Sequence, residues 1–221
     1  MAGRLTNYRL FLKEFRRTFH TTGAILPSSP GLAAALSRFV AEPTDRDDGP
    51  GGKKQILEVG PGTGAVTSRI LAAMGQADRL DMVELNDEFV ARLNERFESE
   101  PVFQAVAERS EIIHDSLLAL PSEPKYDVIV SGLPLNNFSS SDVRELLDSM
   151  RSLLRPGGTL SFFEYIGVRP LRGMVSRQRE RQRLQEISTI LGGLFSEHEI
   201  RRDAVLLNVP PAWVHHVRFS G

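Results

Sequence analysis

The sequence predicts an α/β fold in which a seven-stranded, mostly parallel sheet ends in an antiparallel hairpin and is preceded by an amphipathic helical lead. Short apolar runs alternate with helical stretches from Gln55 to Tyr165, a rhythm typical of parallel strands joined by helices. A glycine-rich loop follows the first of these runs. The last two apolar runs lie close enough along the chain to pair as a hairpin.

The helical lead comprises two helical stretches and a connector. Apolar side chains recur from Asn7 to Phe19 at the spacing i, i+3, i+4, i+7 and i+11, while the basic residues lie mostly off that face. This pattern predicts a basic amphipathic helix. A second helix is expected at about 31–40, and the polar, glycine- and proline-rich segment 42–54 cannot bury a face. We therefore expect residues 1–54 to form a lead and connector, and residues 55–221 to form one domain.

The elements of that domain follow in order along the chain. Strands are expected over the apolar runs 55–59, 79–85, 111–115, 126–132 and 159–165, and helices over 65–74 and 87–98. The motif LRPGG predicts that a further helix ends at Gly157, because proline and glycine interrupt helices. The runs 197–208 and 212–220 supply the two strands of the hairpin.

Composition excludes several classes of site. The 221 residues include no cysteine, which excludes disulfides, thiolate zinc sites and cysteine nucleophiles, and no metal site is predicted. No uncharged apolar run approaches the roughly 20 residues of a membrane span, and the N-terminus lacks the pattern of a signal peptide. We therefore expect a cytoplasmic protein whose contact with a membrane is peripheral.

Charge is distributed unevenly although the net charge is only −1. Residues 1–40 hold six basic and one acidic side chain, residues 81–127 hold twelve acidic and four basic ones, and residues 169–185 hold six arginines and one glutamate. The near-neutral total does not indicate a general nucleic-acid binder. The two basic segments instead indicate local positive surfaces.

The strongest motif is the loop ILEVGPGTG, in which an apolar strand passes Glu58 and runs into Gly60, Gly62 and Gly64. Glycines at alternate positions let the backbone pass close to a ligand and leave N–H groups free at a helix N-terminus. A pyrophosphate site would have the spacing G-x-G-x-x-G, and an acid in front of the loop would repel it. An acid favours a cationic ligand that carries an α-amino group and a sulfonium, which describes S-adenosylmethionine.

Two more carboxylates follow the next strands. Glu84 ends the second strand, where a carboxylate can accept hydrogen bonds from both ribose hydroxyls of an adenosine, and Asp115 follows the third strand, where it can accept from the adenine amino group. Other interpretations stay open. Glu84 could be a solvated strand-end carboxylate, Asp115 could cap a helix before Ser116, and the glycines could form an ordinary tight turn.

The ordered motifs LEVGPGTG, VEL, HDS, YDVIVSGLP and LLRPGGTL resemble the class I S-adenosylmethionine-dependent methyltransferases, which have a Rossmann-like sheet. The resemblance covers about Gln55 to Tyr165. It implies that S-adenosylmethionine is the cofactor. The residues predicted here for cofactor binding are Glu58, Gly60, Pro61, Gly62, Thr63, Gly64, Glu84, Leu85, Asp115, Ser116 and Ser131. Gly23 lies before this range and joins them through the second resemblance given below, as part of a segment that closes over the methionine end of the cofactor.

The loop after the fourth strand, SGLPLNNF, is the candidate acceptor loop. Amine methyltransferases often carry an N/D-P-P-Y/F or N-L-P-Y type loop there. Here Pro134 keeps the shape, but Ser131 stands in place of Asn or Asp and Leu135 in place of the aromatic residue. This departure makes an enzyme that acts on a flipped nucleic-acid base a weaker interpretation, and no nucleic-acid partner is expected.

Three segments resemble the bacterial phospholipid N-methyltransferases, whose members methylate phosphatidylethanolamine stepwise: FLKEFRRTFHTTGAILPSSP, SGLPL, and FFEYIGVRPLRGMVSRQRERQR. The core also resembles the rRNA adenine dimethylases, without a counterpart of their C-terminal helical domain. The resemblance implies an amino-phospholipid substrate, an anionic membrane surface as partner, and a place at the inner face of the cell membrane. An amphipathic helix that packs on its own domain is the alternative.

The candidate residues for chemistry surround the acceptor amine. Tyr165 and His20 could hydrogen-bond the amine or relay its proton to water, and the carbonyls of the turn from Ser131 to Leu133 could orient its lone pair. Lipid phosphate would pair with Arg169 and Arg172, and Arg16 and Arg17 would meet the membrane. Three alternatives stay open for the function: RNA adenine N6-methylation, ornithine-lipid N-methylation, and cofactor binding without turnover.

Overall fold

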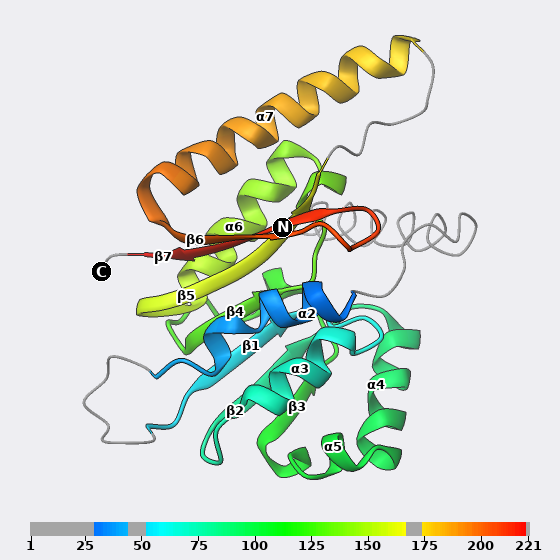
Figure 1. Cartoon of the computed structure of the whole chain (residues 1–221), viewed down its shortest axis with the longest axis vertical. Helices are drawn as coiled ribbons and strands as arrows, with labels where there is room; N and C mark the ends of the chain where they lie inside the picture. The colour runs from blue at the N-terminus through cyan, green and yellow to red at the C-terminus, as the bar shows by residue number, and fades with distance from the viewer. Residues whose placement is uncertain (1–28, 44–51, 167–173, 220–221) are drawn as a thin grey trace.

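The computed structural model describes residues 29–43, 52–166 and 174–219, and its core is a seven-stranded sheet with the order β3-β2-β1-β4-β5-β7-β6 (Figure 1). The first five strands are parallel; β7 pairs antiparallel with β5, and β6 pairs antiparallel with β7. This confirms the predicted fold class. The strands are β1 Gln55–Val59, β2 Arg79–Val83, β3 Ser110–Ile113, β4 Tyr126–Ser131, β5 Leu154–Tyr165, β6 Glu199–Val205 and β7 Ala212–Arg218.

Helices cover both faces of the sheet, so each face carries its own hydrophobic core (Figure 1). One core contains buried residues of α2 and α3, and the other contains buried residues of α6 and α7. The α-helices are α2 Pro30–Leu36, α3 Ala65–Ala73, α4 Asp87–Ser99, α5 Pro101–Gln104, α6 Ser140–Leu153 and α7 Met174–His198. The short 3₁₀ helices are η1 Arg38–Val40, η2 Ala107–Arg109, η3 Leu117–Ala119 and η4 Leu135–Asn137.

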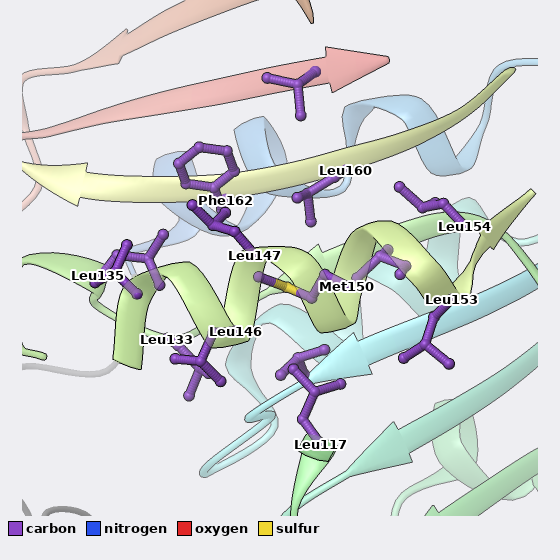
Figure 2. Packing of buried hydrophobic residues seen from close by; sticks show 14 of the residues in the cluster. Leu117, Leu133, Leu135, Leu146, Leu147, Met150, Leu153, Leu154, Leu160 and Phe162 are labelled. Carbon is purple, nitrogen blue, oxygen red and sulfur yellow. The ribbon is translucent and has the colours of Figure 1, made fainter. Parts of the chain in front are cut away.

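The central strand β1 shows why the sheet is buried on both sides. Its side chains alternate, so that Ile56 packs in the α2 and α3 core while Leu57 and Val59 pack in the α6 and α7 core. Figure 2 shows the second core, in which Leu147 and Met150 of α6 lie near residues of β5.

The end of α6 corrects one prediction. The helix ends at Leu153 and not at Gly157, because Leu154 already pairs with Tyr126 of β4 and therefore begins β5. The register of β4 with β5 shifts between Tyr126 and Val128, and Gly157 lies in this irregular stretch with φ of +76°. Pairing along the sheet therefore ends the helix before the proline and glycines are reached.

Part of the predicted lead is described. The second helical stretch is confirmed as α2 and η1, whose residues Leu32, Leu36 and Val40 are buried in the same core as β1 and α3. The predicted helix from Asn7 to Phe19 lies outside the described residues, and the domain boundary after residue 54 stays a prediction. Of the helices that the structure describes, none has both the length and the apolar character that crossing a bilayer requires.

Candidate active site

The carboxyl ends of β1, β2, β3 and β4 meet at one edge of the sheet, and the predicted cofactor residues follow these ends. The loop after β1 lies between the ends of β2 and β4. The Gly60 amide donates to Val83 O at the end of β2 at 3.0 Å, and the Gly132 amide, just after β4, donates to Val59 O at 2.8 Å. The sheet register therefore brings together the glycine loop, the end of β2 and the acceptor loop, which are far apart in the sequence.

The glycine loop is tight on one side and open on the other. Gly60 has φ of +68° and Gly62 has φ of +56°, conformations that other residues rarely adopt. A Cβ at Gly60 would lie 2.7 Å from a methyl carbon of Leu133, whereas a Cβ at Gly62 would have no described atom within 4 Å. Gly64 then serves as the N-cap of α3. The backbone at Gly62 is therefore open on one side, where a bound nucleoside could approach it closely.

Glu84 closes this side of the site. It is buried, and its Oε2 accepts a hydrogen bond from the Gly62 amide at 3.1 Å while its Oε1 accepts from the Asn86 amide at 2.9 Å. Burial raises the pKa of the Glu84 carboxyl, and the two amides oppose this rise. Each oxygen keeps a further lone pair that can accept from a ribose hydroxyl. The geometry therefore fits the predicted ribose contact.

Glu58 does not lie at the mouth of the loop. It is fully buried between β1 and α3, where the hydroxyl and the amide of Thr67 favour its charged form. Burial raises the pKa of the Glu58 carboxyl to about 8, so the group is mostly neutral at pH 7. The sequence predicts a carboxylate in front of the loop, whereas the structure buries this carboxyl between β1 and α3.

Asp115 and Ser116 follow β3, where the sequence allows either a helix cap or a contact with the adenine. Ser116 is buried and its hydroxyl accepts from the Leu118 amide at 3.2 Å, so Ser116 caps η3. Asp115 is exposed, and its Oδ1 accepts from the Ser116 amide at 2.7 Å. Its carboxylate follows β3 at the same edge of the sheet as Glu84 and can accept from an adenine amino group. Leu85, next to Glu84, packs on the α6 and α7 core.

Arg96 of α4 contacts the glycine loop, which the sequence analysis did not predict. Its Nη1 donates to Thr63 O at 2.9 Å and its Nη2 donates to the Ser68 hydroxyl at 3.0 Å. Glu100 accepts from the same guanidinium at 2.7 and 2.8 Å, and the guanidinium lies 4.2 Å from the ring centre of Phe103. Arg96 therefore fixes the loop where it enters α3. Pro61, also in the loop, accepts from the Gly64 amide through its carbonyl.

The acceptor loop lies against the glycine loop. Ser131 is fully buried and its hydroxyl accepts from the Leu133 amide at 3.3 Å, while the Leu133 side chain packs on Gly60. Leu135 is buried in the α6 and α7 core and so cannot take the place of an aromatic residue that covers a sulfonium. The structure thus brings Ser131 and Leu133, but not Leu135, to the cofactor loop.

Tyr165 ends β5 beside the acceptor loop. The side-chain amide of Asn136 donates to Tyr165 O at 3.2 Å, and Arg183 of α7 donates to Asn136 O at 2.6 Å and to Phe138 O at 2.5 Å. Burial raises the pKa of the Tyr165 phenol above its usual value of 10, so this phenol is protonated at neutral pH. The ring packs edge-on against Phe163 on the α2 and α3 core, and a protonated phenol is poorly suited to act as a base.

Six predicted site residues lie outside the described residues: His20, Gly23, Arg16, Arg17, Arg169 and Arg172. Their predicted roles stay predictions. Over the ranges that are described, no cluster of three or more histidine, aspartate or glutamate side chains is arranged to hold a metal ion.

Comparison with known proteins supports the cofactor geometry. Residues 56–158, a little under half of the chain, match the family described as a methyltransferase domain. The chain is 27% identical over 157 residues to an ornithine lipid N-methyltransferase of Singulisphaera acidiphila, an alignment that covers 71% of this chain and 77% of that one. It is 35% identical over 107 residues to a ribosomal RNA small subunit methyltransferase A of a Synechococcus strain, covering 47% of this chain and 34% of that one. The chain spans only 3% and 4% of two large fungal synthetases that it also matches.

The fold is shared with solved methyltransferase structures. A 1,6-didemethyltoxoflavin-N1-methyltransferase of Burkholderia thailandensis, solved with S-adenosylhomocysteine, superposes with a TM-score of 0.64 at 17% identity, covering 98% of this chain and 91% of that one. At that identity the likeness concerns the fold. Within this chain, the open side of Gly62 and the free lone pairs of Glu84 are the groups that fit S-adenosylmethionine.

Proposed function

We propose that this chain, which carries a methyltransferase domain over residues 56–158, is an S-adenosylmethionine-dependent N-methyltransferase of amino-lipids, with phosphatidylethanolamine and its partly methylated forms as acceptors. One observation carries the transferase part of this proposal. The acceptor loop contacts the cofactor loop directly, through the hydrogen bond from Gly132 to Val59 and the packing of Leu133 on Gly60.

Backbone of the glycine loop and carboxylates at the strand ends are the groups that would bind the cofactor. S-adenosylmethionine, when bound, supplies an electrophilic methyl group on a sulfonium. The free side of Gly62 and the lone pairs of Glu84 would hold its nucleoside, and Asp115 would accept from its adenine amino group.

The acceptor side must orient a neutral amine. An alkylammonium has no free lone pair, so the acceptor loses a proton before it attacks. The carbonyls of the turn from Ser131 to Leu133 accept N–H bonds from the amine, and the Tyr165 phenol offers a further hydrogen bond. Holding two reactants in this way can contribute about 7–11 kcal/mol to catalysis. His20, whose placement is not described, is the candidate that would relay the proton to water.

The lipid acceptor is supported by similarity and by charge. The alignment with the ornithine lipid N-methyltransferase covers 77% of that protein, so the similarity is not limited to the cofactor loop. The basic segments 1–40 and 169–185 would attract an anionic membrane surface, at about 1 kcal/mol for each basic residue near the surface. We propose that Arg16 and Arg17 meet that surface at the inner face of the cell membrane, and that Arg169 and Arg172 pair with the lipid phosphate.

A second acceptor is favoured by the same relative. An ornithine-containing lipid also presents a primary amine at a membrane surface, and the relative's name specifies that lipid. Both acceptors fit the same chemistry in the site, so the experiment must offer both. The fragmentary similarity to an RNA methyltransferase makes RNA the third substrate to include.

The test is incubation of the full chain with methyl-labelled S-adenosylmethionine and three separate substrates. These are anionic vesicles that contain phosphatidylethanolamine, the same vesicles with ornithine lipid in its place, and total RNA. Label in mono- or dimethyl-phosphatidylethanolamine supports the proposal, and label only in ornithine lipid transfers it to the second acceptor. Label only in RNA refutes the lipid proposal, and cofactor binding without label in any substrate refutes turnover.

A further inference from the structure

The turn between β6 and β7 exposes three large apolar side chains. Leu206 is 66% exposed, Leu207 is 95% exposed and Val209 is 63% exposed. Elsewhere in the described ranges, only Val102 and Ile200 are exposed apolar side chains of this size. Three such side chains at one turn are costly in water and mark a surface that another apolar phase can cover. We call Leu206, Leu207 and Val209 the hairpin tip.

The backbone of the hairpin tip is held in place. Asn208 is buried between the exposed residues, where its Oδ1 accepts from the Ser29 amide at 3.2 Å and its Nδ2 donates to Pro210 O at 2.6 Å. The Ile166 amide donates to Pro211 O at 2.7 Å. The polar groups of the turn are therefore directed inward, and the apolar side chains are directed outward.

The hairpin tip lies at the edge of the sheet that carries the active site. Ala212, which follows the turn, pairs with Tyr165 at the end of β5, and Tyr165 O accepts from Asn136 of the acceptor loop. Figure 1 shows the red hairpin turn at the same end of the sheet at which β5 ends. A surface that covered the hairpin tip would therefore lie at the end of the sheet that carries the acceptor loop.

Two segments whose sequence is rich in basic residues join the described structure at residues that contact the turn between β6 and β7. Residues 1–28, with five basic side chains and one acidic one, join the described structure at Ser29, whose amide contacts Asn208. Residues 167–173, with two arginines and no acidic residue, follow Ile166, whose amide contacts Pro211. An apolar turn whose contacting residues continue into cationic sequence suits an anionic bilayer, in which acyl chains lie beneath negatively charged headgroups.

We infer that the hairpin tip inserts into the anionic lipid surface from which the acceptor is drawn, and holds the active-site edge of the sheet against that surface. The inference rests on the proposed lipid function and names the membrane-contact surface for it. A lipid amine could then reach the turn from Ser131 to Leu133 while its acyl chains stay in the bilayer.

The test uses the absence of cysteine in the chain, which allows single-cysteine labelling. Leu207→Cys carries an environment-sensitive fluorophore, and Ile200→Cys is the matched control, because Ile200 is 45% exposed at the opposite end of the same strand β6. Anionic vesicles that contain phosphatidylethanolamine should shift the emission of the label at position 207 to the blue, and leave the label at position 200 unchanged.

A second variant measures the contribution to binding. Leu206→Ser, Leu207→Ser and Val209→Ser together should weaken binding to these vesicles by at least about tenfold, given the usual effect of burying even one leucine. Ile200→Ser should bind as the unaltered chain does, and both variants should keep their affinity for S-adenosylmethionine.

Two results would overturn the inference. One is unchanged emission of the probe at position 207 when the vesicles are added. The other is a blue shift without vesicles that accompanies dimerisation, since a second copy of the chain would then cover the hairpin tip. The methyl-transfer assay described under the proposed function reports separately on the enzymatic activity. If lipid is methylated while the probe at position 207 does not respond, the insertion fails and the function stands; if the probe responds and no lipid is methylated, the insertion stands and the acceptor assignment fails.

Discussion

Glu84 Oε2 accepts a hydrogen bond from the amide of Gly62 at 3.1 Å, which joins the end of β2 to the glycine loop after β1. The contact holds the carboxylate beside the part of the loop that is open to a ligand. One side chain therefore shapes the loop and also offers acceptors to the ribose.

Glu84→Ala removes both functions and should weaken the binding of S-adenosylmethionine by about 1.5–3 kcal/mol, the usual loss for a hydrogen bond to a charged group. Calorimetric titration with the cofactor measures the change. Glu108→Ala, at an exposed acidic residue of η2, is the control and should bind normally. Equal affinities of the two variants would remove the ribose assignment.

Glu58 should make the stability of the ligand-free chain depend on pH. Its pKa is about 8 in the folded chain against an ordinary value of 4.5, so the folded state keeps the proton longer than the unfolded state does. The stability contributed by this group is present below pH 4.5 and is lost as pH rises toward 8. Glu58→Gln removes this loss. Between pH 6 and 8.5, the variant should therefore gain about 2 kcal/mol over the unaltered chain in the free energy of unfolding.

Denaturant unfolding of both proteins at the two pH values provides the measurement. The comparison is made as a difference between proteins because other groups titrate in both. A difference that stays constant from pH 6 to 8.5 would show that Glu58 ionises in the folded chain as it does in water.

Arg96→Lys should loosen the glycine loop, because lysine cannot donate to Thr63 O, the Ser68 hydroxyl and Glu100 in the same geometry. We expect the dissociation constant for S-adenosylmethionine to rise by about tenfold, a cost of about 1.4 kcal/mol. Arg92→Lys, on the exposed face of the same helix, is the matched control. An unaltered dissociation constant in Arg96→Lys would mean that the loop keeps its shape without this contact.

Arg183→Lys should affect the acceptor and spare the cofactor. Arg183 donates to two carbonyls of the acceptor loop, Asn136 O and Phe138 O, and contacts no residue of the glycine loop in these bonds. The ratio kcat/KM for lipid should fall by about tenfold while the affinity for S-adenosylmethionine stays the same. Arg181→Lys, exposed on the same helix, should behave as the unaltered chain. A parallel loss of cofactor affinity would contradict a role limited to the acceptor loop.

Reversal of Arg16 and Arg17 to glutamate should weaken binding to anionic vesicles by several kcal/mol in total at low salt, because two attractive charges become repulsive. Affinity for S-adenosylmethionine should not change. Vesicle sedimentation measures the effect, and binding that is equally strong on anionic and neutral vesicles in both proteins would exclude an electrostatic contact through this segment.

The sheet and the cofactor loop could be predicted from sequence because their signals are local. The apolar run from Gln55 to Val59 is β1 itself, and the three glycines follow it directly. The contacts of Arg96 and Arg183 could not be predicted, since they join residues 33 and 47 positions apart and depend on how the helices pack.

Two other features of the fold have a signal in the sequence. The helix α7 was not assigned, yet Ile187, Ile190, Leu191, Leu194 and Phe195 follow a helical spacing, and all five pack on the core. The burial of Glu58 follows from alternation in β1, because both faces of a parallel sheet are covered by helices. The pattern of a loop motif alone had placed that carboxylate in front of the ligand.

The most direct test of the account is mass analysis of lipid after incubation with unlabelled S-adenosylmethionine. Anionic vesicles that contain phosphatidylethanolamine are treated with the full chain and, in parallel, with Glu84→Ala at a cofactor concentration below saturation. The account predicts phosphatidylethanolamine that carries added N-methyl groups, formed more slowly by the variant. Phosphatidylethanolamine of unchanged mass, with methyl groups found in RNA or in no substrate, would contradict it.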